Sequence, residues 1–200
     1  MGRRQFDRLW TIQPLEVWQS LEKRGTLLAD PAHPRYEGEP PEAYHWLTGQ
    51  LRERLPQFHA TLPWWAYCRK PDLRWARHTL PRGSRHVRLE IRPRRSSYFT
   101  FPCWAWTLVF SSQFLARTAE EHRLWLRDVR RAGYTEWGDE LSEELTHRVR
   151  KSWESLFDPN LPRRSWDPDE PRTECFEAAL ARLHLDEVQA MTHFQGARRS

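Results

Sequence analysis

The sequence predicts a single α+β domain over residues 1–200, with a small, mostly antiparallel sheet and about four helices. Some segments alternate apolar and polar residues with the two-residue period of a half-buried strand, whereas others repeat apolar residues every three to four positions, as helices do. The chain carries 12 Trp, and a chain of 200 residues can bury roughly 70% of its unfolded surface. It contains no internal repeat, so we expect one core rather than an array.

The first elements are predicted to be a strand, a helix and a second short strand. Residues 9–13 have the composition of a strand, and Pro14 then takes a favoured first-turn position of a helix. Apolar residues recur at helical spacing up to Gly25, which suits a C-terminal cap. Residues 26–29 predict the next strand.

Four elements are expected in the middle of the chain. A helix is predicted to begin at Pro41, and a buried strand covers residues 63–67. Residues 69–75 are expected to form a basic loop. Residues 86–91 alternate between apolar and charged side chains, so we expect them to form the central strand of the sheet.

An aromatic run at residues 98–110 follows this strand and is expected to cover one face of the sheet. Thr118 and Glu121 have the spacing of a capping box, which predicts the start of a helix that ends at Gly133. A further helix is predicted over residues 139–157.

The C-terminal part is less regular. The Pro-rich segment 159–171 and the first residues, 1–7, are expected to be flexible. Residues 174–182 fit a helix by propensity and a strand by alternation, so both assignments stay open at this point. Residues 191–197 predict a closing strand.

Several classes of protein and site are not expected. No apolar run approaches the roughly 18 residues needed to span a membrane, and the first residues lack the apolar core of a signal peptide. We therefore expect a soluble, cytoplasmic protein that does not bind membranes. The cysteines form no C-x-x-C pair and the nine His form no H-x-x-x-H, so no metal site is expected. Without G-x-G-x-x-G or a P-loop, a Rossmann or P-loop nucleotide site is not expected either.

The charge of the chain leaves two interpretations open. The net charge is +5, and only Lys23, Lys70 and Lys151 are lysines, so the basic residues are almost all arginine. Arginine binds phosphate through paired hydrogen bonds and stacks on aromatic rings, which favours a nucleotide or nucleic-acid partner. Arginines spread over a solvated surface, as codon usage in a GC-rich genome would produce, explain the same charge.

Four blocks of the sequence resemble a bacterial family of unknown function. Trp10–Pro14, Trp-Thr-Ile-Gln-Pro, is similar to the opening signature of that family. The similarity continues at Trp64–Tyr67, Lys151–Asp158 and Leu183–Val188, in the same order over nearly the whole chain. The resemblance implies no established activity. It does imply a strand at the last ambiguous element, with Glu177–Ala179 where the family has a Gln-Ala-Thr core.

A more remote resemblance concerns the order of the elements. The N-terminal strand, Gly-capped helix and short strand, followed much later by the Glu177 strand, are similar to the ADP-ribosyltransferase fold, especially its DNA- and RNA-modifying branches. In that fold a polar or basic residue on the first strand holds the nicotinamide ribose of NAD. An aromatic residue stacks on the base, and a Glu on a late strand stabilises the developing oxocarbenium charge.

Carried over by position, the resemblance implies a set of site residues. Thr11 takes the place of the polar residue on the first strand, Tyr98 or Trp106 supplies the stacking ring, and Glu177 supplies the catalytic carboxylate. The best register puts Ala179, not an acid, at the catalytic position, two residues from Glu177. The resemblance therefore implies NAD as a ligand, in a domain that need not be an active transferase.

Two functions follow from these patterns. The first is a NAD-like nucleotide-binding domain with an ADP-ribosyltransferase-like layout, in which Gln13 joins Thr11 as a ligand contact. The second is a non-enzymatic module that binds nucleic acid or an acidic protein through Arg69, Lys70 and Arg74. Each of these residues also has a structural alternative, as a strand-face residue or as part of a solvated loop.

Overall fold

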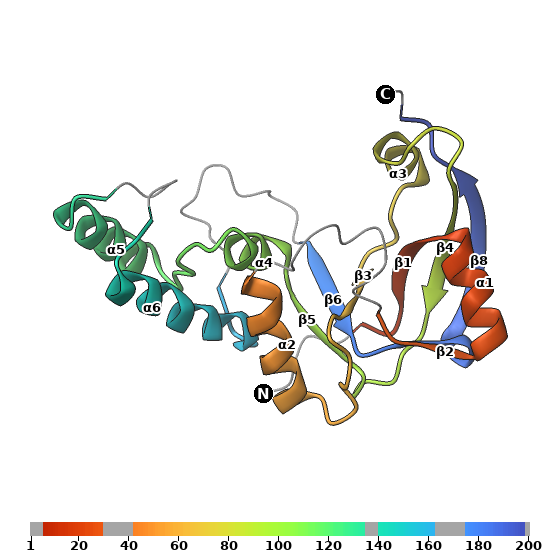
Figure 1. Ribbon diagram of the computed structural model, residues 1–200, viewed down its shortest axis with the longest axis horizontal. Coiled ribbons are helices and arrows are strands. Elements are labelled where there is room, and N and C mark those ends of the chain that lie inside the picture. The colour runs from red at the N-terminus through yellow and green to blue at the C-terminus, as the bar shows by residue number, and fades with distance from the viewer. Residues whose placement is uncertain (1–5, 30–41, 135–139, 163–174, 199–200) are drawn as a thin grey trace. The chain divides into compact units, whose positions relative to one another are not determined.

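The computed structural model describes residues 6–29, 42–134, 140–162 and 175–198. The described part of the chain contains six α-helices, a six-stranded sheet and a two-stranded sheet, so the predicted α+β class is confirmed, with six helices rather than four (Figure 1). The chain divides into two compact units. Unit 1 is Met1–Gly2, Pro41–Ala43 and Phe101–Glu174, and unit 2 is Arg3–Pro40, Tyr44–Thr100 and Cys175–Ser200.

The six-stranded sheet has the strand order β5-β6-β3-β1-β4-β8. Its strands are β1 (Leu9–Pro14), β3 (Trp64–Tyr67), β4 (Arg85–Ile91), β5 (Tyr98–Pro102), β6 (Phe176–Leu180) and β8 (Val188–Gln195). The pairs β6–β3, β3–β1, β1–β4 and β4–β8 are antiparallel, as predicted. The prediction that 86–91 is the central strand is wrong, because β4 lies beside the edge strand β8 and β3 and β1 occupy the middle. Alternation reports that one face of a strand is buried, but it carries no information about the strand's place in the sheet.

The register of the strands separates two faces of this sheet. Successive side chains of a strand point to opposite faces, and directly opposite residues of paired strands share a face. Thr11 of β1 is opposite Leu89 of β4, and Gln13 is opposite Val87, so these four side chains share the face that we call the core face. The other face, here called the mixed face, carries Trp10 and its neighbours.

The core face of unit 2 packs against helix α1 (Leu15–Arg24). Leu15, Val17 and Leu21 of α1 belong to the same buried apolar cluster as Leu9, Val87 and Leu89 of the sheet. Gly25 ends the helix with a φ of 71°, a left-handed conformation that glycine adopts without strain, and its N–H donates to the carbonyl of Leu21 at 2.8 Å. The predicted strand–helix–Gly unit is confirmed.

Four further elements are the two strands of the two-stranded sheet, a 3₁₀ turn and a helix. Strand β2 (Thr26–Leu27) pairs with β7 (Leu183–His184) as the two-stranded sheet, and the short 3₁₀ turn η2 (Leu185–Glu187) leads into β8. Helix α2 (Glu42–Arg54) confirms the predicted helix in that region, although Pro41 lies outside the described residues.

The predicted basic loop at 69–75 is wrong in its second half. Helix α3 (Leu73–Thr79) begins there, because the Asp72 carboxylate accepts a hydrogen bond from the backbone N–H of Arg74 at 2.8 Å. This N-cap satisfies one of the N–H groups that the first turn of a helix leaves free, so a seven-residue helix can start within the charged segment.

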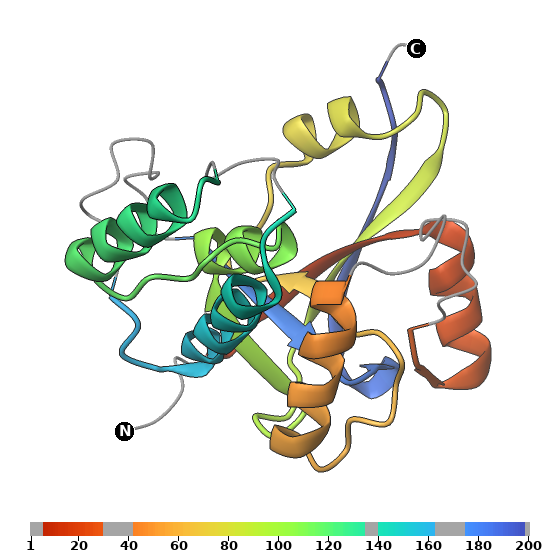
Figure 2. The same ribbon diagram turned by 60° about the vertical axis from the view of Figure 1, so that its left-hand side comes forward.

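Unit 1 contains helices α4 (Cys103–Phe110), α5 (Ala119–Arg131) and α6 (Glu143–Ser152), followed by the 3₁₀ turn η1 (Trp153–Phe157). The predicted capping box is confirmed, since Thr118 Oγ1 accepts from the N–H of Glu121 at 3.0 Å. Helices α5 and α6 lie side by side (Figures 1 and 2), and Arg148 of α6 pairs with Asp128 of α5 at 3.0 Å.

The remaining predictions have mixed outcomes. The ambiguous segment 174–182 is a strand over Phe176–Leu180, and the closing strand starts earlier than expected, at Val188. The aromatic run is strand β5 followed by helix α4, not one extended segment. The helix predicted from 139 begins at Glu143, and residue 139 lies outside the described residues.

Two predictions about the organisation of the chain remain predictions. Flexibility was expected at 1–7 and 159–171, and most of these residues lie outside the described ranges. That all 200 residues form a single domain is not decided by the division into two units. Within the described ranges, no helix has the length and apolar character that crossing a membrane requires.

Candidate functional site

Four acidic or aromatic side chains lie in one row across the mixed face of unit 2. Glu177 of β6 is directly opposite Tyr67 of β3, Tyr67 is opposite Trp10 of β1, and Trp10 is opposite Glu90 of β4. Opposite residues in antiparallel strands have Cβ atoms about 4.5–5.5 Å apart, so the four side chains are neighbours on one face of the sheet. All four are half-buried. We call them the carboxylate–aromatic row, because two acids flank two aromatic rings.

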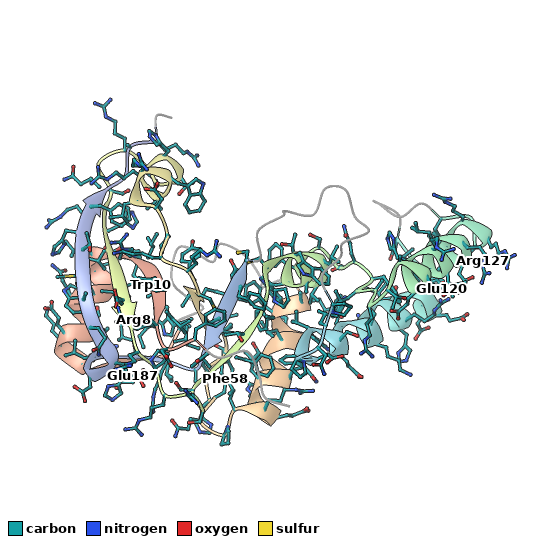
Figure 3. All side chains as sticks on the ribbon, turned by 180° about the vertical axis from the view of Figure 1, so that it is seen from behind. Arg8, Trp10, Phe58, Glu120, Arg127 and Glu187 are labelled. Carbon is teal, nitrogen blue, oxygen red and sulfur yellow. The ribbon has the colours of Figure 1, made fainter. Side chains whose placement is uncertain are left out.

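Glu90 is held at one end of the row by two donors. The indole N–H of Trp10 donates to Glu90 Oε2 at 3.3 Å, and the guanidinium of Arg8 donates to Glu90 Oε1 at 3.1 Å. Figure 3 labels the two donors, Arg8 and Trp10. The Arg8 side chain is 64% exposed and that of Glu90 is 19% exposed, so the guanidinium reaches in from solvent to an inner carboxylate. These bonds fix the plane of the Trp10 ring within the row.

Glu177, at the other end of the row, has a different environment. Burial raises the pKa of its carboxyl group, because leaving water disfavours the charged form. Among the described residues no Lys, Arg or His forms an ion pair with it. A half-buried acid without a cation in the described structure favours either a proton or a positively charged ligand beside it.

The second row of the mixed face is closed by packing. Ala179 of β6 is opposite Trp65 of β3, and Ala179 is fully buried. Tyr44 of α2 meets Trp65 edge to face, with ring centroids 6.2 Å apart and an interplanar angle of 80°. Because residues two apart on a strand share a face, Glu177 and Ala179 point to the same side of the sheet. Glu177 therefore lies in the more open row, and Ala179 lies in the row that is closed by packing.

The loop that leaves β3 borders the mixed face. Arg88 of β4 donates to the carbonyl of Pro71 at 3.1 Å, which ties this loop to the sheet. Arg69 and Lys70 are exposed on the same loop, immediately after Tyr67 and Cys68. Two cationic residues therefore lie within three positions of Tyr67 along the sequence.

Arg74 has a structural partner. Its guanidinium pairs with Asp72 at 3.1 Å, and both side chains are more than half exposed. The pKa of Asp72 is lowered, chiefly by the hydrogen bond from the backbone N–H of Arg74 and then by that from its side chain. Arg74 therefore stabilises the start of α3.

Thr11 and Gln13 lie on the core face, opposite to the face that carries Glu177. Thr11 is 1% exposed and Gln13 is 5% exposed. Gln13 Nε2 donates to Thr11 Oγ1 at 2.6 Å, and Thr11 Oγ1 donates to the carbonyl of Trp65 at 2.8 Å. The two polar groups satisfy each other within the core, so the structure does not bring Thr11 and Glu177 together in one pocket.

The two expected stacking rings are both buried. The Tyr98 hydroxyl donates to the carbonyl of Phe6 at 2.9 Å and accepts from its N–H at 3.3 Å, and burial raises its pKa. Trp106 lies on α4 of unit 1, where its ring centroid is 6.1 Å from that of Phe101 and 5.9 Å from that of Phe110. Both rings serve packing in the described structure.

The sequence matches the family described as "Domain of unknown function (DUF3841)" over residues 8–189. The chain belongs to the DUF3841 family. The resemblance of its sequence blocks to a family of unknown function is thereby confirmed. No curated protein and no solved structure matches the chain.

Sequence reasoning missed three residues of the row in this DUF3841 domain: Trp10, Tyr67 and Glu90. Trp10 and Thr11 are neighbours on one strand, and the choice of Thr11 selected the wrong face for a site that contains Glu177. Alternate residues of a strand share a face of the sheet. Trp10 can be assigned to the face of Glu177 only once the pairing of β6 with β3 and of β3 with β1 is known.

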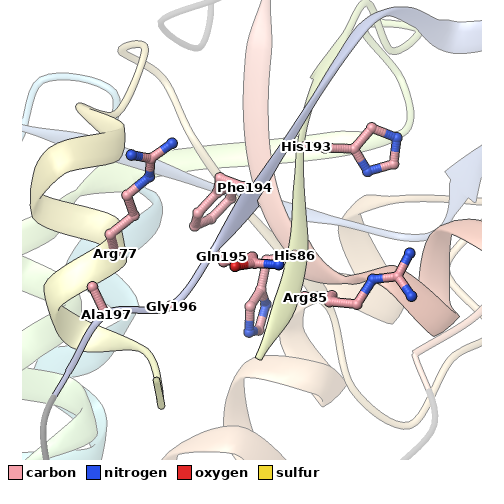
Figure 4. Close-up of a pocket in the computed structure, with 8 residues that line it drawn as sticks. All are labelled: Arg77, Arg85, His86, His193, Phe194, Gln195, Gly196 and Ala197. Carbon is pink, nitrogen blue, oxygen red and sulfur yellow. The ribbon is translucent and has the colours of Figure 1, made fainter. Parts of the chain in front are cut away.

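A separate concavity of about 710 Å³ lies at the end of the β4–β8 pair (Figure 4). Its lining residues are Arg77, Arg85, His86, His193, Phe194, Gln195, Gly196 and Ala197. Arg77 and Arg85 lie on opposite sides of β8 in Figure 4, and the register places His86 opposite Phe194 but Arg85 opposite Gln195. The basic groups around this concavity come from three elements, α3, β4 and β8.

The described ranges contain no group of three or more His, Cys, Asp or Glu side chains that could hold a metal ion. The carboxylate–aromatic row is thus the arrangement of the DUF3841 domain that offers the most chemistry: two acids, two rings and two nearby cations.

Proposed function

We propose that unit 2 of this DUF3841 domain binds a nucleotide of the NAD type at the carboxylate–aromatic row, with an ADP-ribosyltransferase-like layout. The observation that carries the proposal is the register that lines up Glu177, Tyr67, Trp10 and Glu90 on one face. The proposal concerns binding first, and turnover is a separate question.

The nicotinamide ring of NAD has the properties that this row favours. It is planar and aromatic, and as a pyridinium it carries a positive charge. A cation over a Trp or Tyr ring gains about 0.5–2 kcal/mol, and here a carboxylate stands on either side of the rings. Glu177 gains most from such a ligand, since a positive charge beside it offsets the cost of its burial.

The loop after β3 supplies groups for the rest of the nucleotide. Arg69 and Lys70 are exposed just beyond Tyr67, and guanidinium and ammonium groups are the usual partners of a pyrophosphate. With nicotinamide at the row, the diphosphate would extend toward this loop.

Titration with NAD and with NADH, followed by thermal shift and calorimetry, tests the proposal. The reduced ring of NADH carries no positive charge, so we expect NAD to bind about 2- to 30-fold more tightly. Trp10→Leu and Glu177→Gln should weaken NAD binding and remove most of this preference. Trp75→Leu is the matched control, because Trp75 is 56% exposed on α3 and outside the row.

Two results would count against nucleotide binding at the row. One is the absence of any thermal shift at millimolar NAD. The other is an equal loss of binding in Trp75→Leu and Trp10→Leu. Release of nicotinamide, measured in the same samples, shows whether binding is accompanied by cleavage of the bond to the ribose. Its abolition in Glu177→Gln would assign the late carboxylate the role that the remote resemblance implies.

A second candidate function is a module that binds nucleic acid or an acidic protein at the basic loop. Arg69 and Lys70 are exposed there, and the ring of Trp75 stands open beside them in the sequence. Retention on nucleic acid that falls with salt and is lost when Arg69, Lys70 and Arg74 are changed to Ala would support it. Salt-independent behaviour of the wild-type protein would exclude it.

A further inference from the structure

We infer that helix α5 of unit 1 carries a binding surface for the sugar–phosphate backbone of a nucleic acid. The surface consists of Arg123, Arg127, Arg130 and Arg131, with Leu126 among them, and we call it the α5 arginine face. These five residues line one shallow groove of about 400 Å³. It is distinct from the row in unit 2 and from the basic loop after β3.

Helical geometry places the four arginines together. Arg127, Arg130 and Arg131 follow Arg123 at four, seven and eight positions, the spacing that repeats one side of a helix. The opposite side of α5 is buried through Trp125 and Val129, so the arginines point to solvent. All four are exposed, and Arg127 is labelled on α5 in Figure 3.

Among the residues that the structure describes, few acidic side chains compensate the positive charge of this face. In the described ranges, Arg123, Arg130 and Arg131 form no ion pair, whereas Arg127 shares Asp128 with Arg148. The other two acids of the helix are in its first turn. Glu121 accepts from the N–H of Arg117 at 2.6 Å, so its carboxylate is engaged at the cap.

The helix dipole explains only part of this arrangement. Basic residues in the last turn of a helix stabilise it, which accounts for Arg130 and Arg131. Arg123 lies in the first half of α5, and Arg127 lies in its middle, where the dipole gives no such advantage. The dipole therefore does not account for the continuation of the arginines along the helix, and a ligand with regularly repeated negative charge would account for it.

The length and chemistry of the face fit a phosphate backbone. From Arg123 to Arg131 the helix rises about 12 Å, at 1.5 Å per residue. One strand of duplex DNA carries a phosphate about every 3.4 Å, so three to four phosphates lie along that length, close to one per guanidinium. Every cation of the face is arginine, whose planar group binds phosphate through two hydrogen bonds.

Fluorescence anisotropy with a short labelled DNA duplex and with a single-stranded RNA of mixed sequence tests the inference. Four phosphate contacts predict a slope of log K against log salt of about −3.6 for the duplex and about −2.8 for the single strand. For the duplex this is an affinity loss of about 100-fold between roughly 50 and 200 mM salt. The variant R123Q/R127Q/R130Q/R131Q should abolish this binding, and Gln preserves the helix because its propensity is close to that of Arg.

The matched control is K23Q/R24Q/R92Q/R94Q, which removes the same number of charges from exposed positions of unit 2. It should retain binding within about twofold and keep the salt slope. Equal loss in both quadruple variants, with far-ultraviolet circular dichroism unchanged, would overturn the inference, because only net charge would then matter. Displacement of the duplex by polyglutamate at equal charge concentration would also overturn it, in favour of an acidic protein partner.

Discussion

Glu177 is a residue whose protonation is affected by folding. Burial raises the pKa of its carboxyl group above the ordinary value of 4.5, so the folded chain holds this proton to higher pH than the unfolded chain does. The stability that this proton gives the folded state is fully present below pH 4.5, the ordinary pKa of this group in the unfolded chain. It is lost as the pH rises through the raised pKa of the folded state, because the unfolded chain releases the proton at a lower pH. Glu177→Gln cannot ionise, so its melting temperature should exceed that of the wild type at neutral pH. Melting curves across pH should show this difference vanish in acid, and a difference that persists there would contradict the assignment.

Tyr98 shows the cost of losing a buried hydroxyl. Tyr98→Phe leaves the N–H and the carbonyl of Phe6 without the partner that the hydroxyl provides. A hydrogen bond contributes about 0.5–1.5 kcal/mol, so we expect the free energy of unfolding to fall by about 1–3 kcal/mol. Urea unfolding measures this, and the m-value should stay unchanged because the exposed surface does not differ. An unaltered midpoint would show that water replaces the hydroxyl.

The sequence identifies the right strands at the residue scale but not always the right side of them. The remote resemblance points to Thr11 as the polar residue on β1, whereas the register shows that Trp10 shares the face of Glu177. A shift of one position moves a side chain to the other face, and only strand pairing settles which face is which. Glu177 is pointed to only by the remote resemblance, whose best register places Ala179 at the catalytic position.

Two glycines illustrate how an element's end differs from its interior. Gly25 caps α1 with a φ of +71°, whereas Gly49 lies within α2 and a Cβ added there would meet nothing within 4 Å. Gly25→Ala should therefore destabilise the protein by about 1–2 kcal/mol, the penalty of a left-handed conformation for an L-residue. Gly49→Ala should stabilise it by about 0.5–1 kcal/mol, because alanine loses less freedom in a helix. Denaturant unfolding of both variants gives the two signs, and equal signs would refute the cap.

Elements with local signals were predicted well, and elements that depend on distant partners were not. The Thr118 capping box and the Gly25 cap are encoded in a few neighbouring residues. Helix α4 is apolar on nearly all sides, so no periodicity distinguished it from a buried strand. The segment around Glu177 becomes a strand because β3 pairs with it, and that partner lies far away in the sequence.

The division into two units could not be foreseen from composition. Unit 2 is assembled from three separate segments and unit 1 contains all of the residues between them, while aromatic and charged residues are spread through both. The class of fold was predictable because it requires only the types of element, whereas the order of the strands requires their pairing.

At the scale of the whole molecule we expect two separable binding activities. The carboxylate–aromatic row lies in unit 2 and the α5 arginine face lies in unit 1, and they share no residue. R123Q/R127Q/R130Q/R131Q should therefore keep the thermal shift with NAD, and Trp10→Leu should keep the salt-dependent binding of nucleic acid. Both titrations on both variants check this. Loss of both activities in either variant would show that the two surfaces depend on each other.

The segmented construction of unit 2 has a consequence for synthesis. Strands β1, β3 and β4 leave the ribosome early, but β6 and β8, which pair with β3 and β4, follow only after residues 101–174. Chains usually complete their N-terminal part first. Here the helices of unit 1, which are synthesised later, can pack together while β3 and β4 still lack their partner strands β6 and β8. A nascent chain of this protein thus presents unpaired strand edges to chaperones until β6 and β8 have been synthesised.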